Sequence, residues 1–219
     1  MCGRFTFIDI EDIRERFKTE PINLKPNYNV APTQNVPVIL NHQLSMFRWG
    51  LIPSWAKDPS IGHKMINARA ETINEKPSFK HSLQRKRCLI VADGFYEWKK
   101  EGTTKQPHRI TLKNKKLFGF AGLWDTWKSP LGEIINSCSI ITTTPNELMV
   151  EIHDRMPVIL SRDSERVWLD QSIVDGGVLK SLLVPYPAEL MIVYEVSGFV
   201  NSVKNNGPEC LAPVGATLF

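Results

Sequence analysis

The sequence predicts one α+β domain, built on a curved, barrel-like and mainly antiparallel sheet with short peripheral helices. Short strand-type segments run from end to end of the 219 residues, and only a few short helical patterns interrupt them. These helices are too few and too short for a regular βαβ series. No internal repeat or low-complexity linker divides the chain, so we predict a single domain over residues 1–219.

In the first half of the chain, the elements follow from the spacing of apolar residues. Ile10–Phe17 places three apolar side chains on one helical face. Val36–Leu40 and Ser45–Gly50 are typical of the two strands of a hairpin. Prolines make residues 51–64 irregular, which indicates a loop, and a helical region around Phe79 follows.

In the second half, strands outnumber helices. The predicted strands are Cys88–Ala92, Phe95–Trp98, His108–Leu112, Leu117–Leu123, Ser137–Thr142, Val158–Leu160 and Leu190–Val196. Short helices are predicted at Pro145–Glu151, Ser164–Leu169 and Gly177–Leu183. We interpret Lys99–Gln106 as a polar loop and expect the tail after Pro208 to be loosely ordered.

Composition indicates an ordinary soluble protein, with 42% hydrophobic and 23% charged residues. The net charge of +4 permits nucleic-acid binding without requiring it. No apolar run approaches the ~18 residues of a membrane span, and no apolar signal core follows the N-terminus. We therefore expect a cytoplasmic protein without a membrane segment.

The cysteine pattern favours neither disulfides nor a metal site. Cys2, Cys88, Cys138 and Cys210 are widely scattered, with no CxxC and no Cys/His ligand spacing. We interpret the last three as small buried apolar residues. The chain also lacks a P-loop and a GxGxxG motif, so no metal and no cofactor is expected.

Cys2 directly follows the start methionine, and removal of Met1 would leave an α-amine and a thiol on adjacent carbons. The amine titrates near ~8 and the thiol near ~8.5 in model peptides, so both are partly nucleophilic at neutral pH. Such a group condenses with an aldehyde to an imine and closes to a thiazolidine. Arg4 would favour the thiolate and attract a phosphate. Alternatively, Cys2 is a chance residue at a frayed terminus.

Three further polar clusters suit binding or proton transfer, and each has a purely structural alternative. Asn67 and Arg69 point the same way on extended chain, where they can orient a hydroxyl and bind a phosphate, or they are a helix-entry residue and a surface cation. Glu97 lies among aromatic residues that would raise its pKa, or it faces outward. His153 is an acid or base oriented by Asp154, or it is solvated.

Trp55 lies in the predicted loop and has two possible roles. It caps an edge of the core, or it is exposed between Lys57 and Lys64 and stacks on a base.

Motifs along nearly the whole chain resemble, in order, the SOS-response-associated peptidase family of abasic-site-processing proteins. The matching stretches are Met1-Cys2-Gly3-Arg4-Phe5, Tyr28-Asn29-Val30-Ala31-Pro32, Trp49-Gly50-Leu51-Ile52-Pro53, Ile66-Asn67-Ala68-Arg69-Ala70-Glu71-Thr72, Asp93-Gly94-Phe95-Tyr96-Glu97-Trp98, Ile152-His153-Asp154-Arg155-Met156-Pro157 and Val203-Lys204-Asn205-Asn206-Gly207.

The resemblance implies a single β-rich domain that binds single-stranded DNA and crosslinks itself to abasic sites. By motif match, Cys2 is the N-terminal nucleophile once Met1 is removed. Asn67 would position the opened deoxyribose, Glu97 would handle protons during imine formation and ring closure, and His153 would assist sugar opening and crosslink reversal. The positions implied to hold flanking phosphates are Arg4, Arg69 and Arg155. The expected partner is single-stranded DNA with an abasic site, bound by a monomer.

The chain departs from the family at one place. Close bacterial relatives carry two adjacent tryptophans after Pro-Gly, whereas this chain has Pro53-Ser54-Trp55-Ala56. The wedge beside the lesion is therefore expected to be smaller.

Two other functions fit the same residues. In an N-terminal-nucleophile peptidase or amidase, which could also cleave ahead of Cys2, the Cys2 amine would act as base for its own thiol, with Asn67 as an oxyanion donor. A non-covalent reader of single strands would use Trp55 and the arginines.

Overall fold

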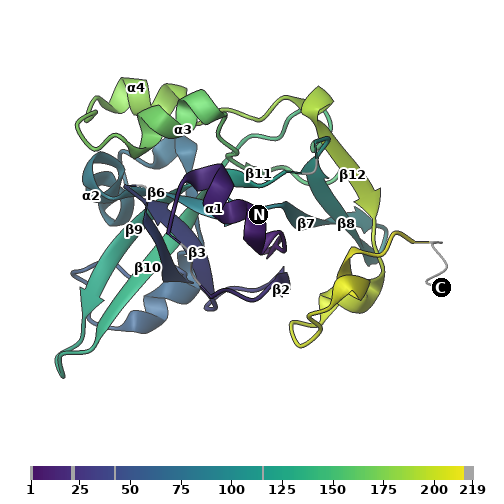
Figure 1. Cartoon of the computed structure of the whole chain (residues 1–219), viewed down its shortest axis with the longest axis horizontal. Helices are drawn as coiled ribbons and strands as arrows, with labels where there is room; N and C mark the ends of the chain where they lie inside the picture. Colours follow the sequence, from purple (N-terminus) through teal and green to yellow (C-terminus); the bar gives the residue numbers. More distant parts are fainter. Residues whose placement is uncertain (1, 21–22, 42, 115, 215–219) are drawn as a thin grey trace.

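The computed structural model describes residues 2–20, 23–41, 43–114 and 116–214, in which two sheets share one core. In Figure 1 the closed sheet lies at the left beneath short helices, and strands β7, β8 and β12 lie at the right. This arrangement confirms the predicted α+β class with a barrel-like, mainly antiparallel sheet. No helix among the described residues is long and apolar enough to cross a membrane.

Five strands close into a barrel: β3 (Asn35–Leu40), β4 (Gln43–Trp49), β6 (Arg87–Ala92), β9 (Phe118–Lys128) and β10 (Ile134–Thr143). They pair in the order β10-β4-β3-β6-β9, and β9 pairs again with β10, which closes the ring. The β4–β10 pair is parallel and the other pairs are antiparallel. Ring closure satisfies the backbone donors and acceptors that an open edge would expose.

Strand β10 also pairs with two short strands, one of which carries a predicted site residue while the other follows one in sequence. β5 (Asn67–Arg69) runs parallel to it, with Asn67 opposite Ile140. β11 (Met156–Pro157) is antiparallel to it and begins three residues after His153. One strand therefore brings two distant segments of the chain to the same end of the barrel.

The second sheet has the order β12-β8-β7-β1-β2, and all of its pairs are antiparallel. Its strands are β1 (Arg4–Phe7), β2 (Asn27–Val30), β7 (Gly94–Glu101), β8 (Thr104–Leu112) and β12 (Met191–Glu195). β1, which follows Cys2, lies beside β7, which carries Glu97.

Alternation along the strands explains how the two sheets share a core. Leu89 and Val91 of β6 pack beneath the helices, while the intervening side chains of β6 join the core between the sheets. In that core the ring of Phe5 packs edge-on against Trp49 and Phe120, with centroids 5.0 and 5.8 Å apart.

The helices are α1 (Ile10–Phe17), α2 (Pro77–Arg85), α3 (Arg162–Leu169) and α4 (Gly176–Ser181). Fully buried Arg87 fixes two of them to the barrel, because its guanidinium donates to the carbonyls of Leu83 in α2 and Trp168 in α3. These bonds satisfy carbonyls at helix ends that have no partner within the helix.

Helix α1 and the hairpin of β3 and β4 confirm the predictions made for those segments, whereas the predicted polar loop Lys99–Gln106 is wrong. Strand β7 continues to Glu101, and β8 begins at Thr104 after a tight turn in which Gly102 has φ +61°. The side chains at this hairpin tip are exposed and polar, so they show none of the apolar alternation that indicates a strand.

Two other predicted elements, a helix and a strand, differ from the structure. Residues 145–151 form hydrogen-bonded turns rather than a helix, because the Asn146 side chain accepts from the main-chain N–H groups of Leu148 and Met149. The segment Val158–Leu160 forms a single β bridge at Ile159 instead of a strand.

The chain just after Pro208 is ordered, contrary to the predicted loose tail. Pro208–Leu211 is a short 3-10 helix, and Cys210 within it is buried. Pro213 then pairs with Val196 at the end of β12. The last part of the predicted tail, residues 215–219, lies outside the described residues.

Candidate active site

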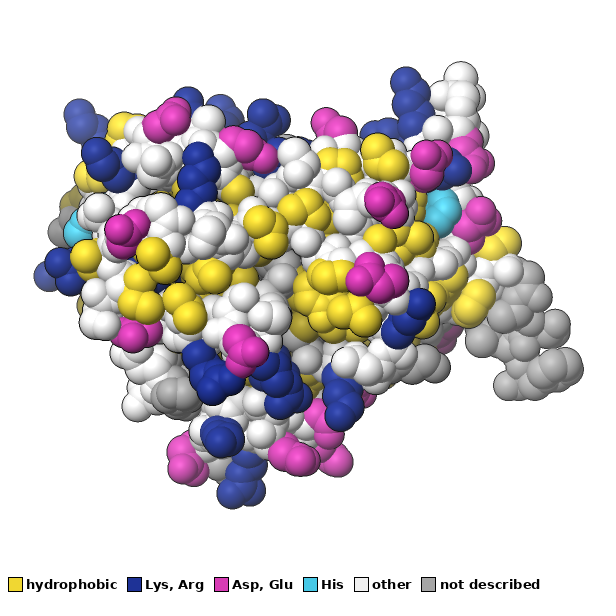
Figure 2. Space-filling model, turned by 90° about the horizontal axis from the view of Figure 1, so that it is seen from above, with side chains coloured by type: hydrophobic (Ala, Val, Ile, Leu, Met, Phe, Trp, Pro, Cys, Tyr) yellow, Lys and Arg dark blue, Asp and Glu magenta, His cyan; other side chains and the backbone are white. Residues whose placement is uncertain are grey.

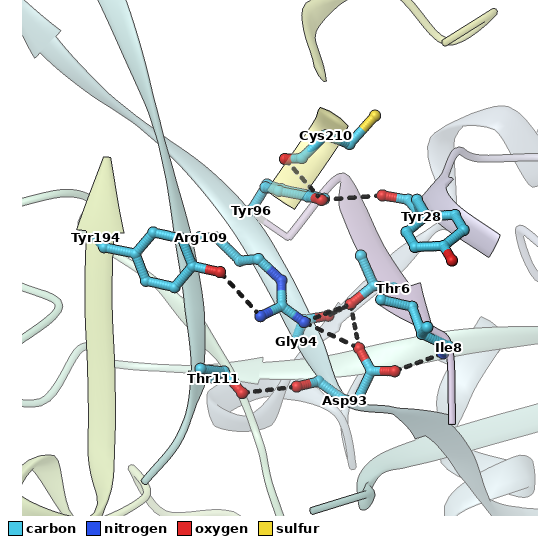
Figure 3. Close-up of polar contacts among 10 residues, drawn as sticks. All are labelled: Thr6, Ile8, Tyr28, Asp93, Gly94, Tyr96, Arg109, Thr111, Tyr194 and Cys210. Carbon is cyan, nitrogen blue, oxygen red and sulfur yellow. Dashed lines mark hydrogen bonds and ion pairs between the residues drawn. The ribbon is translucent and has the colours of Figure 1, made fainter. Parts of the chain in front are cut away.

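A buried polar network holds β1, and with it Cys2, against the second sheet (Figure 3). The Asp93 carboxylate accepts from the Thr6 hydroxyl, from the main-chain N–H of Ile8 and, at 3.1 Å, from the Arg109 guanidinium. Arg109 in turn donates to the hydroxyl of Tyr194 on β12 at 3.1 Å. Because these bonds join four strands or strand ends in a buried setting, the strand behind Cys2 has one well-defined position.

Gly94 makes room for this network. A Cβ on Gly94 would lie only 2.7 Å from the Arg109 guanidinium nitrogen Nη2. The glycine in the Asp93-Gly94-Phe95-Tyr96-Glu97-Trp98 motif is thus required for close packing at the base of the site.

Cys2 is fully buried and is held by its main chain. Its carbonyl oxygen accepts a hydrogen bond from Asn67 Nδ2 at 2.9 Å. Burial raises the pKa of the Cys2 thiol, and the nearby Glu97 carboxylate raises that pKa further. A hydrogen bond with the main chain of Arg4 lowers this pKa, but burial outweighs it, so the group is a thiol at neutral pH.

Asn67 brings a second polar atom to the same place. Its Oδ1 is buried and has no hydrogen-bond partner among the described residues. A buried acceptor without a partner costs free energy that a bound hydroxyl or amine would recover. Asn67 therefore fixes Cys2 with one end of its carboxamide and can accept from a ligand with the other.

Glu97 is 2% exposed, which excludes the outward-facing alternative for this residue. Burial raises the pKa of its carboxyl to about 7. At neutral pH both protonation states are populated, so the group can donate or accept a proton. His153 lies beside it, with Nε2 4.0 Å from Glu97 Oε2.

His153 can alternate between two protonation states. Its Nδ1 accepts from the main-chain N–H of Arg155 at 3.1 Å, which requires an unprotonated nitrogen. The same Nδ1 lies 2.7 Å from Asp154 Oδ1, a contact that favours a protonated one. Burial and the cation of Lys105 lower the pKa of His153 and outweigh the Asp154 carboxylate, which raises it, so the neutral ring is favoured.

Glu97 and His153 line a cavity of about 760 Å³. The other lining residues are Arg4, Trp98, Lys100, Lys105, Ile152, Asp154 and Asn201. The motifs did not single out Lys100, Lys105 or Asn201, because the hairpin that carries the lysines was interpreted as a loop. Among the described residues no group of three His, Cys, Asp or Glu side chains could hold a metal ion.

The face of the molecule seen in Figure 2 carries charges of both signs. On the face above α3 and α4, Lys and Arg side chains are interleaved with Asp and Glu (Figure 2). That face therefore offers no continuous cationic path for an anionic polymer.

The predicted phosphate-binding arginines differ in how they are engaged. Arg4 lines the cavity, but it donates to Asn29 Oδ1 at 2.7 Å and to the Val200 carbonyl at 2.9 Å. Arg155 forms a bidentate ion pair with Glu71, at 2.7 and 2.9 Å. Both arginines thus stabilise the walls of the site.

Arg69 and Trp55 are both exposed. Arg69 follows Asn67 by two residues on β5, so the two side chains share a face of that strand. Trp55 is 60% exposed, which excludes the core-capping alternative and leaves a ring face open to a ligand.

Comparison with known proteins agrees with these motifs. A family model described as SOS response associated peptidase (SRAP) matches residues 1–203. The abasic site processing protein YoqW of Bacillus subtilis is 53% identical over 221 residues, covering 96% of this chain and 99% of the relative. The abasic site processing protein HMCES of Xenopus tropicalis is 36% identical, covering 87% of this chain and 67% of the relative.

A solved structure supports the same assignment. The crystal structure of a Bacteroides thetaiotaomicron protein matches with a TM-score of 0.90 and 31% identity, and the match covers 97% of this chain and all of that one. The family resemblance read from the motifs is confirmed. The chain belongs to the SOS response associated peptidase (SRAP) family.

Proposed function

We propose that this protein processes abasic sites in single-stranded DNA by forming a covalent thiazolidine crosslink through Cys2, after Met1 has been removed. Its relatives YoqW and HMCES are named abasic site processing proteins, which supports this activity. The observation that carries the covalent step is the proximity of Glu97, with a pKa near neutrality, to both the Cys2 thiol and His153.

The first step is imine formation. An abasic deoxyribose is in equilibrium with its open aldehyde, and the Cys2 α-amine adds to the C1′ carbon. Water then leaves, and the protonated Glu97 carboxyl supplies the proton that makes hydroxide a neutral leaving group. Asn67 Oδ1 accepts a hydrogen bond from a sugar hydroxyl and so holds the opened sugar near Cys2.

The second step is ring closure. The Cys2 sulfur forms a bond to C1′ as the carbon–nitrogen double bond becomes single, and the thiol proton passes through Glu97 to the nitrogen. Because burial disfavours the thiolate, the thiol needs such an acceptor within reach. Both nucleophiles belong to one residue, so closure is intramolecular, with effective molarities on the order of 10⁵ M or more. The ring protects the site from β-elimination.

The experiment is denaturing gel electrophoresis of the protein, lacking Met1, incubated with abasic single-stranded DNA. Wild type should give a durable slow-migrating band, Cys2→Ala none, and Glu97→Gln a band that forms at least 10-fold more slowly. Cys88→Ala, which removes a different buried thiol, serves as the control and should crosslink like wild type. Durable crosslinking by Cys2→Ala would rule out the proposed chemistry.

The peptidase alternative makes a different demand on the site. Cleavage ahead of Cys2 would require donors on the Met1 carbonyl, whereas Asn67 donates to the carbonyl of Cys2. Mass spectrometry of a purified Asn67→Ala variant tests this alternative. If the variant still loses Met1, then Asn67 is not needed as an oxyanion donor for cleavage ahead of Cys2.

A further inference from the structure

The hairpin of β7 and β8 extends beyond the N-terminal strand. Pairing of β1 with β7 runs from Thr6–Gly94 to Arg4–Tyr96 and ends there. Pairing of β7 with β8 continues past that point to Glu101–Thr104. The tip of the hairpin therefore borders the cavity on the side where β1 ends.

Two lysines face each other across this hairpin. Lys100 and Lys105 are direct cross-strand partners, both exposed, and both line the cavity that contains Glu97 and His153. Like charges directly opposite one another destabilise a strand pair. The nearest carboxylate along the hairpin, that of Glu101, is on the residue paired with Thr104 rather than with either lysine.

The cavity is lined by the cations of Arg4, Lys100 and Lys105 and by the carboxyl groups of Glu97 and Asp154, so cations outnumber the acidic groups. Arg4 is engaged by Asn29 and Val200. No ion pair is found for Lys100 or Lys105 among the described residues, so their charges remain available. The cation of Lys105 also acts on His153, whose pKa it lowers, so the lysine pair lies within electrostatic reach of the proposed chemistry.

We propose that Lys100 and Lys105 bind a backbone phosphate of the DNA strand beside the abasic nucleotide. A phosphodiester between two ammonium groups relieves their repulsion and fixes the strand at the open side of the cavity. This inference rests on the proposed function for the identity of the strand. It adds a contact from the tip of the hairpin, residues 99–106, which lies outside the family motifs.

The first test measures non-covalent binding of an intact single-stranded oligonucleotide by fluorescence anisotropy over a range of KCl concentrations. Each lost phosphate contact reduces the slope of log K against log[salt] by about 0.7 for single strands. A Lys100→Gln/Lys105→Gln protein should therefore show a slope about 0.7 shallower than wild type, as expected for one phosphate. The control is Lys113→Gln, which removes an exposed lysine just beyond the far end of β8. Twice the change in slope that it causes is the change expected from losing any two exposed lysines.

The second test separates binding from hairpin structure. Lys100→Glu places a carboxylate opposite Lys105, so it should preserve or raise the melting temperature while it weakens DNA binding at least 5-fold. If Lys100 only stabilised the hairpin, the affinity of Lys100→Glu for DNA would change in the same direction as its melting temperature. The inference would be overturned if Lys100→Glu bound DNA with the affinity of wild type. It would also be overturned if the salt slope of the double variant changed by no more than twice the change caused by Lys113→Gln.

Failure of the proposed function gives a different pattern. With saturating protein the double variant should crosslink abasic DNA to the same final extent as wild type, but at subsaturating protein the rate should fall. If wild type bound DNA with the predicted lysine dependence and formed no crosslink, the covalent chemistry would fail and the phosphate contact would stand.

Discussion

Glu97 shows how one buried side chain can be adjusted for proton transfer. Alternation along a strand places Phe95 and Glu97 on one face and Tyr96 and Trp98 on the other, and the aromatic surroundings predicted a raised pKa for Glu97. The structure confirms the burial and gives a pKa of about 7. The 4.0 Å contact with His153 could not be predicted from the sequence, because Glu97 lies on β7 of one sheet and His153 lies beside β11 of the other, and only the fold brings them together.

The raised pKa of Glu97 predicts a pH dependence of stability. The ordinary pKa is 4.5 and the folded value is about 7, so the folded protein holds this proton more tightly than the unfolded chain. Its contribution is fully present below about pH 4.5 and is lost as the pH rises through about 7, a difference on the order of 3 kcal/mol.

Thermal melts between pH 5 and pH 8 test this dependence. Relative to Glu97→Gln, which cannot ionise, the melting temperature of wild type should fall as the pH rises. Parallel curves for the two proteins would show that Glu97 does not titrate in this range.

Arg69 and Arg155 should respond differently to substitution. Exposed Arg69 is predicted to contact a phosphate, so Arg69→Gln should make the salt slope of single-strand binding shallower by about 0.7 without changing the melting temperature. Arg155→Gln removes a bidentate pair with Glu71 and should lower the melting temperature. Anisotropy titrations and thermal melts of both variants measure these effects. A lower melting temperature in Arg69→Gln but not in Arg155→Gln would contradict these roles of the two arginines.

At the scale of elements, the position of β1 depends on the Asp93–Arg109 ion pair. Removing one partner of a buried pair leaves an uncompensated charge and costs about 3–5 kcal/mol. Asp93→Ala should therefore lower the free energy of unfolding by that amount in denaturant titrations. The exposed pair of Arg166 and Asp163 provides the control, since Arg166→Ala should cost less than about 1 kcal/mol. Equal effects of the two substitutions would show that the buried network does not hold the strand.

The elements that sequence predicts well are those with a strong apolar period. α1 and the hairpin of β3 and β4 follow their patterns closely. The β7–β8 hairpin was missed because its tip is polar on both faces, so only pairing reveals it. The turn at Asn146 resembles a helix start in sequence, yet its side chain bonds to the following N–H groups and the helix does not continue.

At the scale of the whole molecule, barrel closure gathers the site. The general architecture could be predicted because short strands fill the chain and long helices are absent. The closing contacts could not, since the parallel pairing of Arg48 and Trp49 with Ser137 and Cys138 joins segments far apart in the sequence. The positions of Asn67 and His153 depend on that closure through β5 and β11.

The oligomeric state remains a prediction at this scale. We expect the free protein and its DNA complex each to contain one copy of the chain. Light scattering at several protein concentrations should give the mass of one chain throughout, and a concentration-dependent increase would contradict this.

The central claim, closure of a ring through both the amine and the sulfur of Cys2, is tested most directly by counting free thiols in the DNA adduct. The chain has four cysteines, and exhaustive alkylation of the denatured protein should modify all of them. In the adduct, mass spectrometry should find three alkylated cysteines and an unmodified Cys2 joined to the sugar. Four alkylated cysteines in a durable adduct would show that the thiol is free and would contradict the thiazolidine.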